Sequence, residues 1–368
     1  MARVGFVMRE ELKRWYNSLL EPERHQNLVL RNYLKYFACT DMGRSLGLLE
    51  IDSYEEYSRR VPVRSYGEYA RYINLMIEGR CTITPEDPVI FGLSSGTTGK
   101  PKLIPLTKSD VETRRKLMLI GMVHCEEVWR KRLHGRDSLM FCLPSRVASL
   151  EVKGRKIACG YISGILAEIL TGGTPEWSSK LRGDKQYWRK YFEEALDAFL
   201  QRDVGLMLGS APMIYEFGLY VKKRLKRRPA DVRRVEVVMC FGVPDIQESY
   251  VDELRRLYGE GLSVVEGYGA TEGMLALQYD ERGVLAPFYN AYFYEVRVGG
   301  KVKPLYSMRQ GEVGELIVTT PSLLRYRMGD LVECCSDGRL FRVLGRHGLA
   351  SSLSFKLQKI FSHLLSLF

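Results

Sequence analysis

The sequence contains no long run of apolar residues. None of its stretches reaches the roughly 20 consecutive apolar residues that a membrane-spanning helix needs, and its first residues lead directly into the charged segment 9–11 rather than into a signal-peptide core. Low-complexity tracts and internal repeats are also missing. These absences disfavour membrane, exported and fibrous proteins, and we expect a soluble cytoplasmic protein without a membrane partner.

Cysteine pairs with the spacing of metal ligands are missing as well. The eight cysteines are scattered over 368 residues without a C-x-x-C motif, and the adjacent Cys334 and Cys335 do not indicate a metal site by spacing alone. We therefore expect reduced and mostly buried thiols.

Negative charge is in deficit, since 55 Lys and Arg residues face 44 Asp and Glu residues, a formal net charge of +11. The densest basic segment, residues 222–228, could indicate a nucleic-acid partner. It lies at the end of an apparent helix and just before Pro229, where cations favourably meet the negative end of the helix dipole. No nucleic-acid-binding motif accompanies it. We expect a solvated helix end, and an anionic substrate also suits a basic protein.

The predicted elements divide the chain into four parts. Residues 1–80 have apolar positions at helical spacing, which predicts an outer helical layer. Residues 81–284 alternate strand-like runs with helical patterns, which predicts an α/β core with a largely parallel sheet under helices. Residues 285–345 predict a β-rich subdomain, and residues 346–368 a hinge and a truncated C-terminal segment.

Local signals place several of these elements. Ser109 and Glu112 form a capping-box pattern that predicts the start of a buried helix over residues 111–130. Asp337-Gly338 predicts a hairpin turn. The strands predicted in the core are residues 138–143, 204–208, 235–241 and 263–266, and the other helices are residues 187–201 and 247–258.

A loop rich in hydroxyls and glycines joins two predicted extended segments. It consists of Ser94, Ser95, Gly96, Thr97, Thr98, Gly99, Lys100, Pro101 and Lys102. Glycines let backbone N–H groups approach phosphate oxygens, hydroxyls add donors, and lysines supply charge. It is not a Walker A loop, because Ser94 takes the place of the first glycine and Pro101 follows Lys100. An ordinary surface turn is the alternative, but the pattern favours a polyphosphate.

This loop resembles the phosphate-binding signature of the adenylate-forming superfamily, which includes acyl-CoA synthetases, firefly luciferase and nonribosomal-peptide adenylation domains. Two further motifs resemble that superfamily in the same order, Tyr-Gly-Ala-Thr-Glu at residues 268–272 and Tyr-Arg-Met-Gly-Asp at residues 326–330. The resemblance implies the N-terminal domain of an adenylate-forming enzyme, with helix-covered, mostly parallel sheets and a small distorted β-barrel. It also implies ATP and Mg²⁺ as cofactors.

The resemblance implies roles for single residues. Thr271 would contact the α-phosphate, Glu272 would hold Mg²⁺ and Asp330 would receive the ribose hydroxyls. Tyr268, with Gly269 beside it, would pack on adenine. Taken singly, Glu272 and Asp330 would more often be solvated or capping carboxylates; the shared pattern is what favours function.

Three other residues complete the predicted site. Lys102 would add positive charge during the reaction. Gly242 follows a buried strand, where superfamily members wrap a turn around adenine, and Arg346 resembles the arginine that reaches the nucleotide at the hinge. His347 and Gly348 depart from the usual hinge pattern.

Within the superfamily the sequence most resembles the auxin-responsive-promoter family of acyl-acid amido synthetases and its microbial relatives, through residues 61–72, 102–105 and 324–330. This implies that a carboxylic acid is activated as its acyl-adenylate and transferred to an amino acid. An acyl-CoA ligase of the phenylacetate-CoA-ligase type, with coenzyme A as acceptor, is one alternative. The other is a catalytically incomplete nucleotide-binding module, because the usual C-terminal domain of about a hundred residues is not recognised and a separately encoded domain could be a partner.

The acyl pocket is predicted between the helix at residues 111–130 and residues 161–165, with Met213, Ile214 and Phe217 nearby. No acyl contact is assigned to a single side chain, because apolar residues at helical spacing more often belong to the core.

Overall fold

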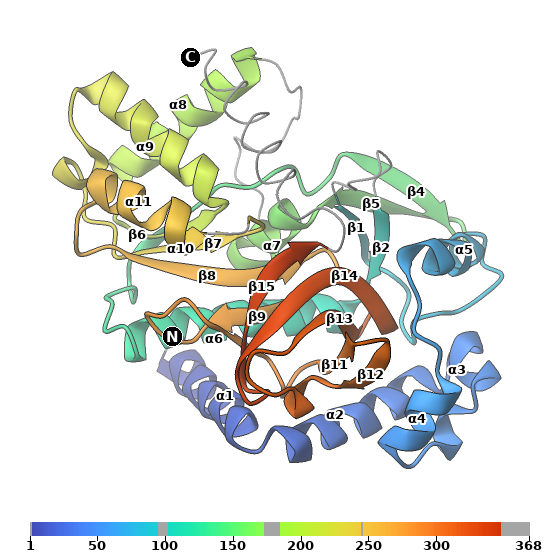
Figure 1. The fold of residues 1–368 in the computed structure, drawn as a ribbon. Helices are drawn as coiled ribbons and strands as arrows, with labels where there is room; N and C mark the ends of the chain where they lie inside the picture. The colour runs from blue at the N-terminus through green and yellow to red at the C-terminus, as the bar shows by residue number, and fades with distance from the viewer. Residues whose placement is uncertain (1, 95–101, 173–184, 244–245, 347–368) are drawn as a thin grey trace.

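Two β-sheets, the helices that cover the parallel strands and a layer of N-terminal helices form the part of the chain that the structure describes (Figure 1). The computed structural model describes residues 2–94, 102–172, 185–243 and 246–346, without the side chains of residues 2–6, 185–186 and 346. Within this part no helix is both long and apolar enough to cross a membrane. Five of the eight cysteines are buried, as expected.

The larger sheet has 11 strands in the order β12-β11-β13-β14-β15-β10-β9-β8-β7-β6-β3. Within this mixed sheet the parallel part corresponds to the four strands predicted in the core. It consists of β3 (Asp137–Met140), β6 (Val204–Gly209), β7 (Val237–Phe241) and β8 (Ser263–Ala270). The antiparallel part consists of β9 (Gly273–Gln278), β10 (Leu285–Pro287), β11 (Phe293–Val298), β12 (Lys301–Pro304), β13 (Val313–Thr320), β14 (Leu323–Ser336) and β15 (Leu340–Arg346).

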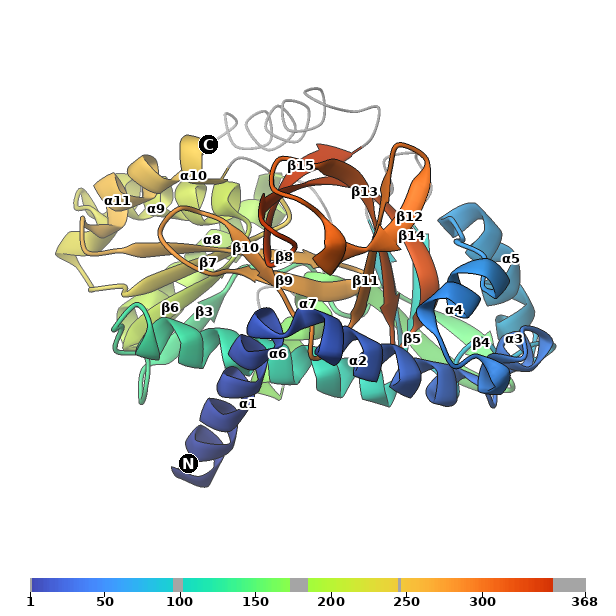
Figure 2. The same cartoon turned by 60° about the horizontal axis from the view of Figure 1, so that its bottom comes forward.

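The described strands do not close into the β-barrel that we expected. Strands β11 to β15 instead continue the same sheet and stand up from the plane of β7 and β8 (Figure 2). Strand β14 is 14 residues long, and its register shifts twice against β13 and twice against β15. Such irregularities bend a strand and increase its twist without requiring closure. The predicted turn at Asp337-Gly338 is confirmed, since both residues have positive φ between β14 and β15.

The smaller sheet has four strands in the order β2-β1-β5-β4, namely β2 (Lys102–Leu106), β1 (Ile90–Ser94), β5 (Arg155–Tyr161) and β4 (Ala148–Val152). Strands β1 and β2 are antiparallel and pair up to Ser94 opposite Lys102, so the phosphate-loop residues 95–101 connect two paired strands. The hairpin of β4 and β5 was not predicted from the sequence. Its strands carry exposed polar residues on both sides of Lys153-Gly154, which weakens the apolar alternation.

Helices cover both faces of the parallel strands. Figure 1 shows α8 (Lys185–Gln201), α9 (Ala211–Leu225), α10 (Ile246–Ser249) and α11 (Val251–Tyr258) on one side and α6 (Lys108–Glu127) on the other. Alternate residues of β7 point to opposite faces of the sheet. Val238 and Cys240 pack in one core cluster, and Val237 and Met239 pack in the other. This alternation within an apolar strand is what the buried, helix-covered sheet requires.

The N-terminal segment is helical, as predicted. It comprises α1 (Ala2–Leu20), α2 (Pro22–Phe37), α3 (Asp41–Ser45), α4 (Tyr54–Arg60) and α5 (Tyr66–Ile77). The remaining helices are α7 (Ile162–Thr171) and the 3₁₀ turns Leu48–Glu50, Pro229–Asp231 and Leu305–Ser307. Helices α1 and α2 run beneath α6 and the antiparallel strands (Figure 1).

The start of α6 differs from the prediction. Thr107 is the N-cap, and its side chain accepts a hydrogen bond from the backbone N of Asp110 at 3.2 Å. Ser109 instead donates to Glu86, whose Oε2 also accepts from the backbone N of Ser109 at 3.0 Å. The predicted capping box of Ser109 and Glu112 is therefore wrong. Thr107 and Ser109 both have a hydroxyl that suits an N-cap. The Ser109 hydroxyl is engaged by Glu86, so Thr107 is the cap.

A buried histidine joins α1, α6 and β9. The Nε2 of His124 lies 3.1 Å from the carbonyl oxygen of Gln278, so Nε2 carries the proton and Nδ1 accepts from the hydroxyl of Tyr16 at 2.6 Å. Burial lowers the pKa of His124 to about 4. The protonated form would have to break the contact with Tyr16 in an apolar environment.

This histidine should make stability depend on pH. Because the pKa of about 4 lies below the ordinary value of 6.5, the unfolded chain binds the proton more tightly between these values. The free energy of unfolding should fall as the pH is lowered, by about 2 kcal/mol from pH 7 to pH 5. Urea denaturation measures this change. The His124→Gln variant should lose most of it, and a variant of the exposed His134 should keep it; equal pH dependence in both would contradict the assignment.

Candidate active site

Three segments that are distant in the sequence meet at the carboxylate of Glu272. Its Oε1 accepts a hydrogen bond from the Tyr326 hydroxyl at 3.0 Å and lies 3.6 Å from Nζ of Lys102. The ammonium of Lys102 also donates to the Tyr326 hydroxyl at 3.2 Å. Only 3% of the Glu272 side chain is exposed. The structure thus brings together the end of the phosphate loop and both further motifs.

Tyrosines of α5 hold this group of side chains in place. The ring of Tyr326 is fully buried and packs edge-on against Tyr69 at 5.7 Å between centroids. The Tyr69 hydroxyl accepts from the backbone N of Leu324 at 2.8 Å. Lys102 lies 5.5 Å from the ring centre of Tyr66, a distance at which an ammonium is attracted to an aromatic face. Neither Tyr66 nor Tyr326 was predicted as a site residue.

A fully buried ion pair supports the turn that carries Thr271 and Glu272. Nε of Arg114 on α6 lies 3.0 Å from Oδ2 of Asp110, one helical turn away. The other nitrogens of Arg114 donate to the carbonyl oxygens of Ala270 at 3.1 Å and Thr271 at 2.9 Å. Burial raises the pKa of Asp110, and the guanidinium opposes this shift. Arg114 therefore fixes the backbone just before Glu272.

Thr271 lies against the strand that leads into the phosphate loop. A Cβ atom added to Gly92 of β1 would come within 2.7 Å of Cγ2 of Thr271, so only glycine leaves room for this contact without a shift. Two residues further along β1, the Oγ of Ser94 is buried and has no hydrogen-bond partner among the described residues. A buried hydroxyl in this state is suited to a ligand atom.

Tyr268 of β8 contacts Asp330 of β14, although three strands separate β8 from β14 in the sheet order. The Tyr268 hydroxyl donates to Oδ2 of Asp330 at 2.6 Å, and Asp330 is 8% exposed. In the β14–β15 register Asp330 pairs with Arg346, the predicted hinge arginine, whose side chain lies outside the described residues. Ser95, Gly96, Thr97, Thr98, Gly99 and Lys100 also lie outside them.

The turn predicted to hold adenine follows β7. Gly242 has φ of +77°, which favours glycine. The preceding Phe241 covers β8, because a Cβ atom on Gly267 would come within 2.0 Å of its ring and one on Gly269 within 3.4 Å. Glycine at these positions lets the aromatic ring lie directly on the strand before the Thr-Glu motif.

An apolar cavity of about 470 Å³ lies where the acyl pocket was predicted. Arg114 and Met118 of α6, Tyr161 and Met213 are among its lining residues. Ile214 and Phe217, which we expected nearby, are instead fully buried in the core between α9 and the sheet. The cavity also touches Phe241, Gly242, Gly269 and Ala270, so it adjoins the residues predicted for the nucleotide.

Comparisons with known proteins agree with the fold. Residues 11–168 match the family model described as GH3 family N-terminal domain. The solved structure of the acyl acid amido synthetase AtGH3.15 in complex with 2,4-DB is similar with a TM-score of 0.73 at 17% identity, over 93% of this chain and 70% of that chain. The chain has the fold of the adenylate-forming enzymes. The resemblance to the superfamily and to its acyl amido synthetases is confirmed.

A second similar structure is a 2-hydroxyisobutyryl-CoA ligase in the postadenylation state in complex with 2-HIB-AMP, with a TM-score of 0.61 at 14% identity. The match covers 87% of this chain and 67% of the ligase chain. No curated protein sequence matches the chain significantly. The adenylate-forming fold is therefore shared with an amido synthetase and with a CoA ligase, and the roles of single residues stay predictions.

The buried pair of Arg114 and Asp110 should dominate the stability of this region. An Arg114→Met variant should lose about 3–5 kcal/mol of unfolding free energy, because it leaves the Asp110 carboxylate buried without its partner. The double variant Asp110→Leu with Arg114→Met should recover much of that loss. Urea denaturation compares the two, with Arg115→Met, an exposed neighbour, as the matched control. Equal losses in the single and double variants would contradict this account.

Proposed function

We propose that the protein activates a carboxylic acid with ATP as its acyl-adenylate and transfers the acyl group to the amino group of an amino acid. The convergence of Lys102, Glu272 and Tyr326 carries this proposal. A cation, a buried carboxylate and a bridging hydroxyl meet beside an apolar cavity, which suits a reaction between an anionic nucleotide and an acid with an apolar tail.

The donor set fits ATP and Mg²⁺. Lys102 and the partnerless hydroxyl of Ser94 border the phosphate loop, and the carboxylates of Glu272 and Asp330 offer hard oxygens and acceptors for a diol. The described residues hold no cluster of three or more metal-binding side chains. Glu272 would therefore hold the ion together with substrate phosphates, as Mg²⁺ commonly requires. When bound, Mg²⁺ would neutralise charge that develops on the phosphates.

The two steps that we propose conserve atoms. An oxygen of the carboxylate attacks the α-phosphorus of ATP, and pyrophosphate leaves; the amine then attacks the acyl carbon, loses a proton, and AMP leaves. Positioning and charge neutralisation limit the first step more than proton transfer does. Lys102 would offset charge on the phosphates, and Thr271, fixed through its carbonyl by Arg114, would orient the α-phosphate.

Transfer to coenzyme A is the second candidate function, because the fold is shared with a 2-hydroxyisobutyryl-CoA ligase. Both candidates require the same first step. They differ in the acceptor, so product analysis after mixing ATP, acid and either an amino acid or coenzyme A separates them. A C-terminal domain encoded separately is a further proposed partner, and its addition should then raise the rate of either reaction.

Acid-dependent exchange of pyrophosphate into ATP should reveal the first step. In a panel of aryl and alkyl acids, we expect exchange with at least one acid. Glu272→Gln and Lys102→Ala should each lower kcat/KM by about 100-fold or more, because each removes charge placed at the reacting phosphates. Lys301→Gln, an exposed cation on β12, serves as the control. Nucleotide binding without exchange for any acid would sink the enzyme proposal and favour a binding module.

A bulky residue in the cavity should affect the acid and spare the nucleotide. Leu166 of α7 lines the cavity. The Leu166→Trp variant should raise the KM for the acid by about tenfold or more, with the KM for ATP within about twofold, because the added ring occupies acyl volume. Leu219→Trp, on the exposed side of α9, is the matched control. An equal increase in both KM values would place the acid elsewhere.

A further inference from the structure

An arginine-rich cavity lies at the amino ends of the parallel strands, opposite the acyl cavity at their carboxyl ends. Strands β6 and β7 end at the acyl cavity with Gly209 and Phe241. At their amino ends the connections that lead into β3, β6 and β7 lie side by side, because the strands are parallel. There Arg130, Arg132, Arg136, Arg234 and Glu236 line an open cavity of about 490 Å³.

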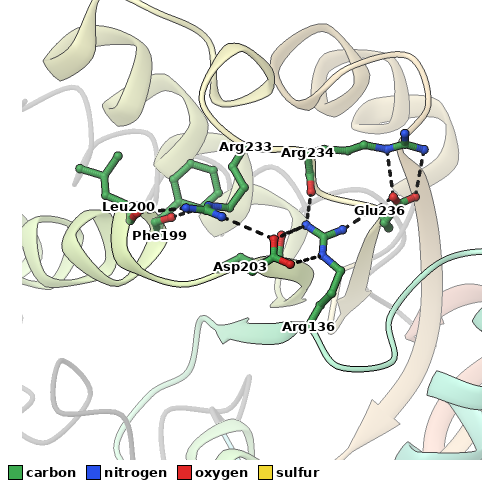
Figure 3. Close-up of polar contacts among 8 residues, drawn as sticks. Arg136, Phe199, Leu200, Asp203, Arg233, Arg234 and Glu236 are labelled. Carbon is green, nitrogen blue, oxygen red and sulfur yellow. Dashed lines mark hydrogen bonds and ion pairs between the residues drawn. The ribbon is translucent and has the colours of Figure 1, made fainter.

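Arg136 forms the fixed centre of this cluster (Figure 3). Its guanidinium makes two hydrogen bonds with Asp203, at 3.1 and 2.9 Å, and donates to the carbonyl oxygens of Val204 at 3.0 Å and Arg234 at 2.6 Å. Gly205 leaves room for it, since a Cβ atom there would lie 3.1 Å from the arginine side chain. Arg136 is therefore held in one orientation before any ligand binds.

The carboxylates present do not balance the arginines. Asp203 also lies 3.4 Å from Arg233, and Glu236 lies 2.9 Å from Arg234 and 3.7 Å from Arg136. Five arginines against these two carboxylates leave an excess of three positive charges. Arg130 and Arg132 are exposed and form no ion pair or side-chain hydrogen bond with any described residue. The cluster thus contains three arginines that are paired with carboxylates, and Arg130 and Arg132, which are not.

We propose that this cavity binds a small phosphorylated anion at a site separate from the ATP site. The planar fork of a guanidinium matches two oxygens of a phosphate, and a phosphate group carries enough charge to compete with Glu236. Arg130 and Arg132 supply the free donors, and Arg136 fixes the floor of the cavity. A preformed cavity with an excess of like charge concentrates anions.

A compact ligand fits these observations better than a nucleic acid. The neighbouring basic segment at residues 222–228 ends α9, and its last arginines are engaged locally. Arg228 pairs with Asp231 at 2.9 Å, and Arg227 donates to the carbonyl oxygen of Asp231. The unpaired arginines Arg130 and Arg132 gather around one cavity instead of extending along a surface that could follow a phosphate backbone.

Titration calorimetry with inorganic pyrophosphate tests this site. The Lys102→Ala variant, which removes the cation assigned to the ATP site, should still bind one pyrophosphate. Adding Arg130→Gln and Arg132→Gln should weaken that binding by at least about tenfold, because each charge-assisted contact contributes strongly. Adding Arg31→Gln and Arg71→Gln instead, two exposed arginines on α2 and α5, should change it by less than about twofold, a shift expected from net charge alone.

Two kinds of result would contradict the anion site. No pyrophosphate binding to Lys102→Ala, or equal weakening in both pairs of arginine variants, would overturn the proposal. A short single-stranded RNA that binds more tightly than pyrophosphate and depends on Arg130 and Arg132 would overturn it in favour of a nucleic-acid surface. Thermal unfolding midpoints of the variants check that each is folded. The exposed side chains of Arg130 and Arg132 form no ion pair or hydrogen bond with a described residue, so both substitutions should be tolerated.

Discussion

The contact among Glu272, Tyr326 and Lys102 ties the candidate site to the fold. It joins the β8–β9 turn, the first part of β14 and the start of β2, three places that no local interaction would bring together. A buried carboxylate needs a cation and hydrogen-bond donors around it. The surrounding architecture supplies both: α5 holds Tyr326 through Tyr69, and α6 holds the turn through Arg114.

The parallel strands β6 and β7 have a cavity at each of their two ends. At their carboxyl ends, β6 and β7 border an apolar cavity next to the predicted nucleotide residues, where ligands commonly bind in open α/β sheets. At their amino ends, the loops gather arginines around Arg136. Helices cover both faces of the parallel strands, and the two cavities lie at opposite ends of these strands. The separation of apolar and cationic surfaces therefore follows from the topology, and it is consistent with two sites for chemically different molecules.

Motif residues of the candidate site can be recognised in the sequence more readily than the residues that hold them in place. Motif residues such as Glu272 and Asp330 can be recognised because their type and order are specific, and in the structure Glu272 contacts Tyr326 and Asp330 contacts Tyr268. Arg114 cannot be recognised, because it stands beside Arg115 in one helix and only packing buries one and exposes the other. Thr107 and Ser109 offer the same ambiguity for the cap of α6. The predicted barrel was wrong because bulges within β14, which have no clear sequence signal, curve the sheet without closing it.

A crystal structure with a non-hydrolysable ATP analogue and Mg²⁺ tests the central claim most directly. The account predicts that the ribose hydroxyls lie within hydrogen-bond distance of Asp330, that the ion is bound by Glu272, and that the α-phosphate lies beside Thr271 and Lys102. Such a structure would also show whether the acyl cavity opens toward that phosphate. A nucleotide bound away from Glu272 and Asp330, with the contact of Tyr326 and Lys102 unchanged, would contradict the account.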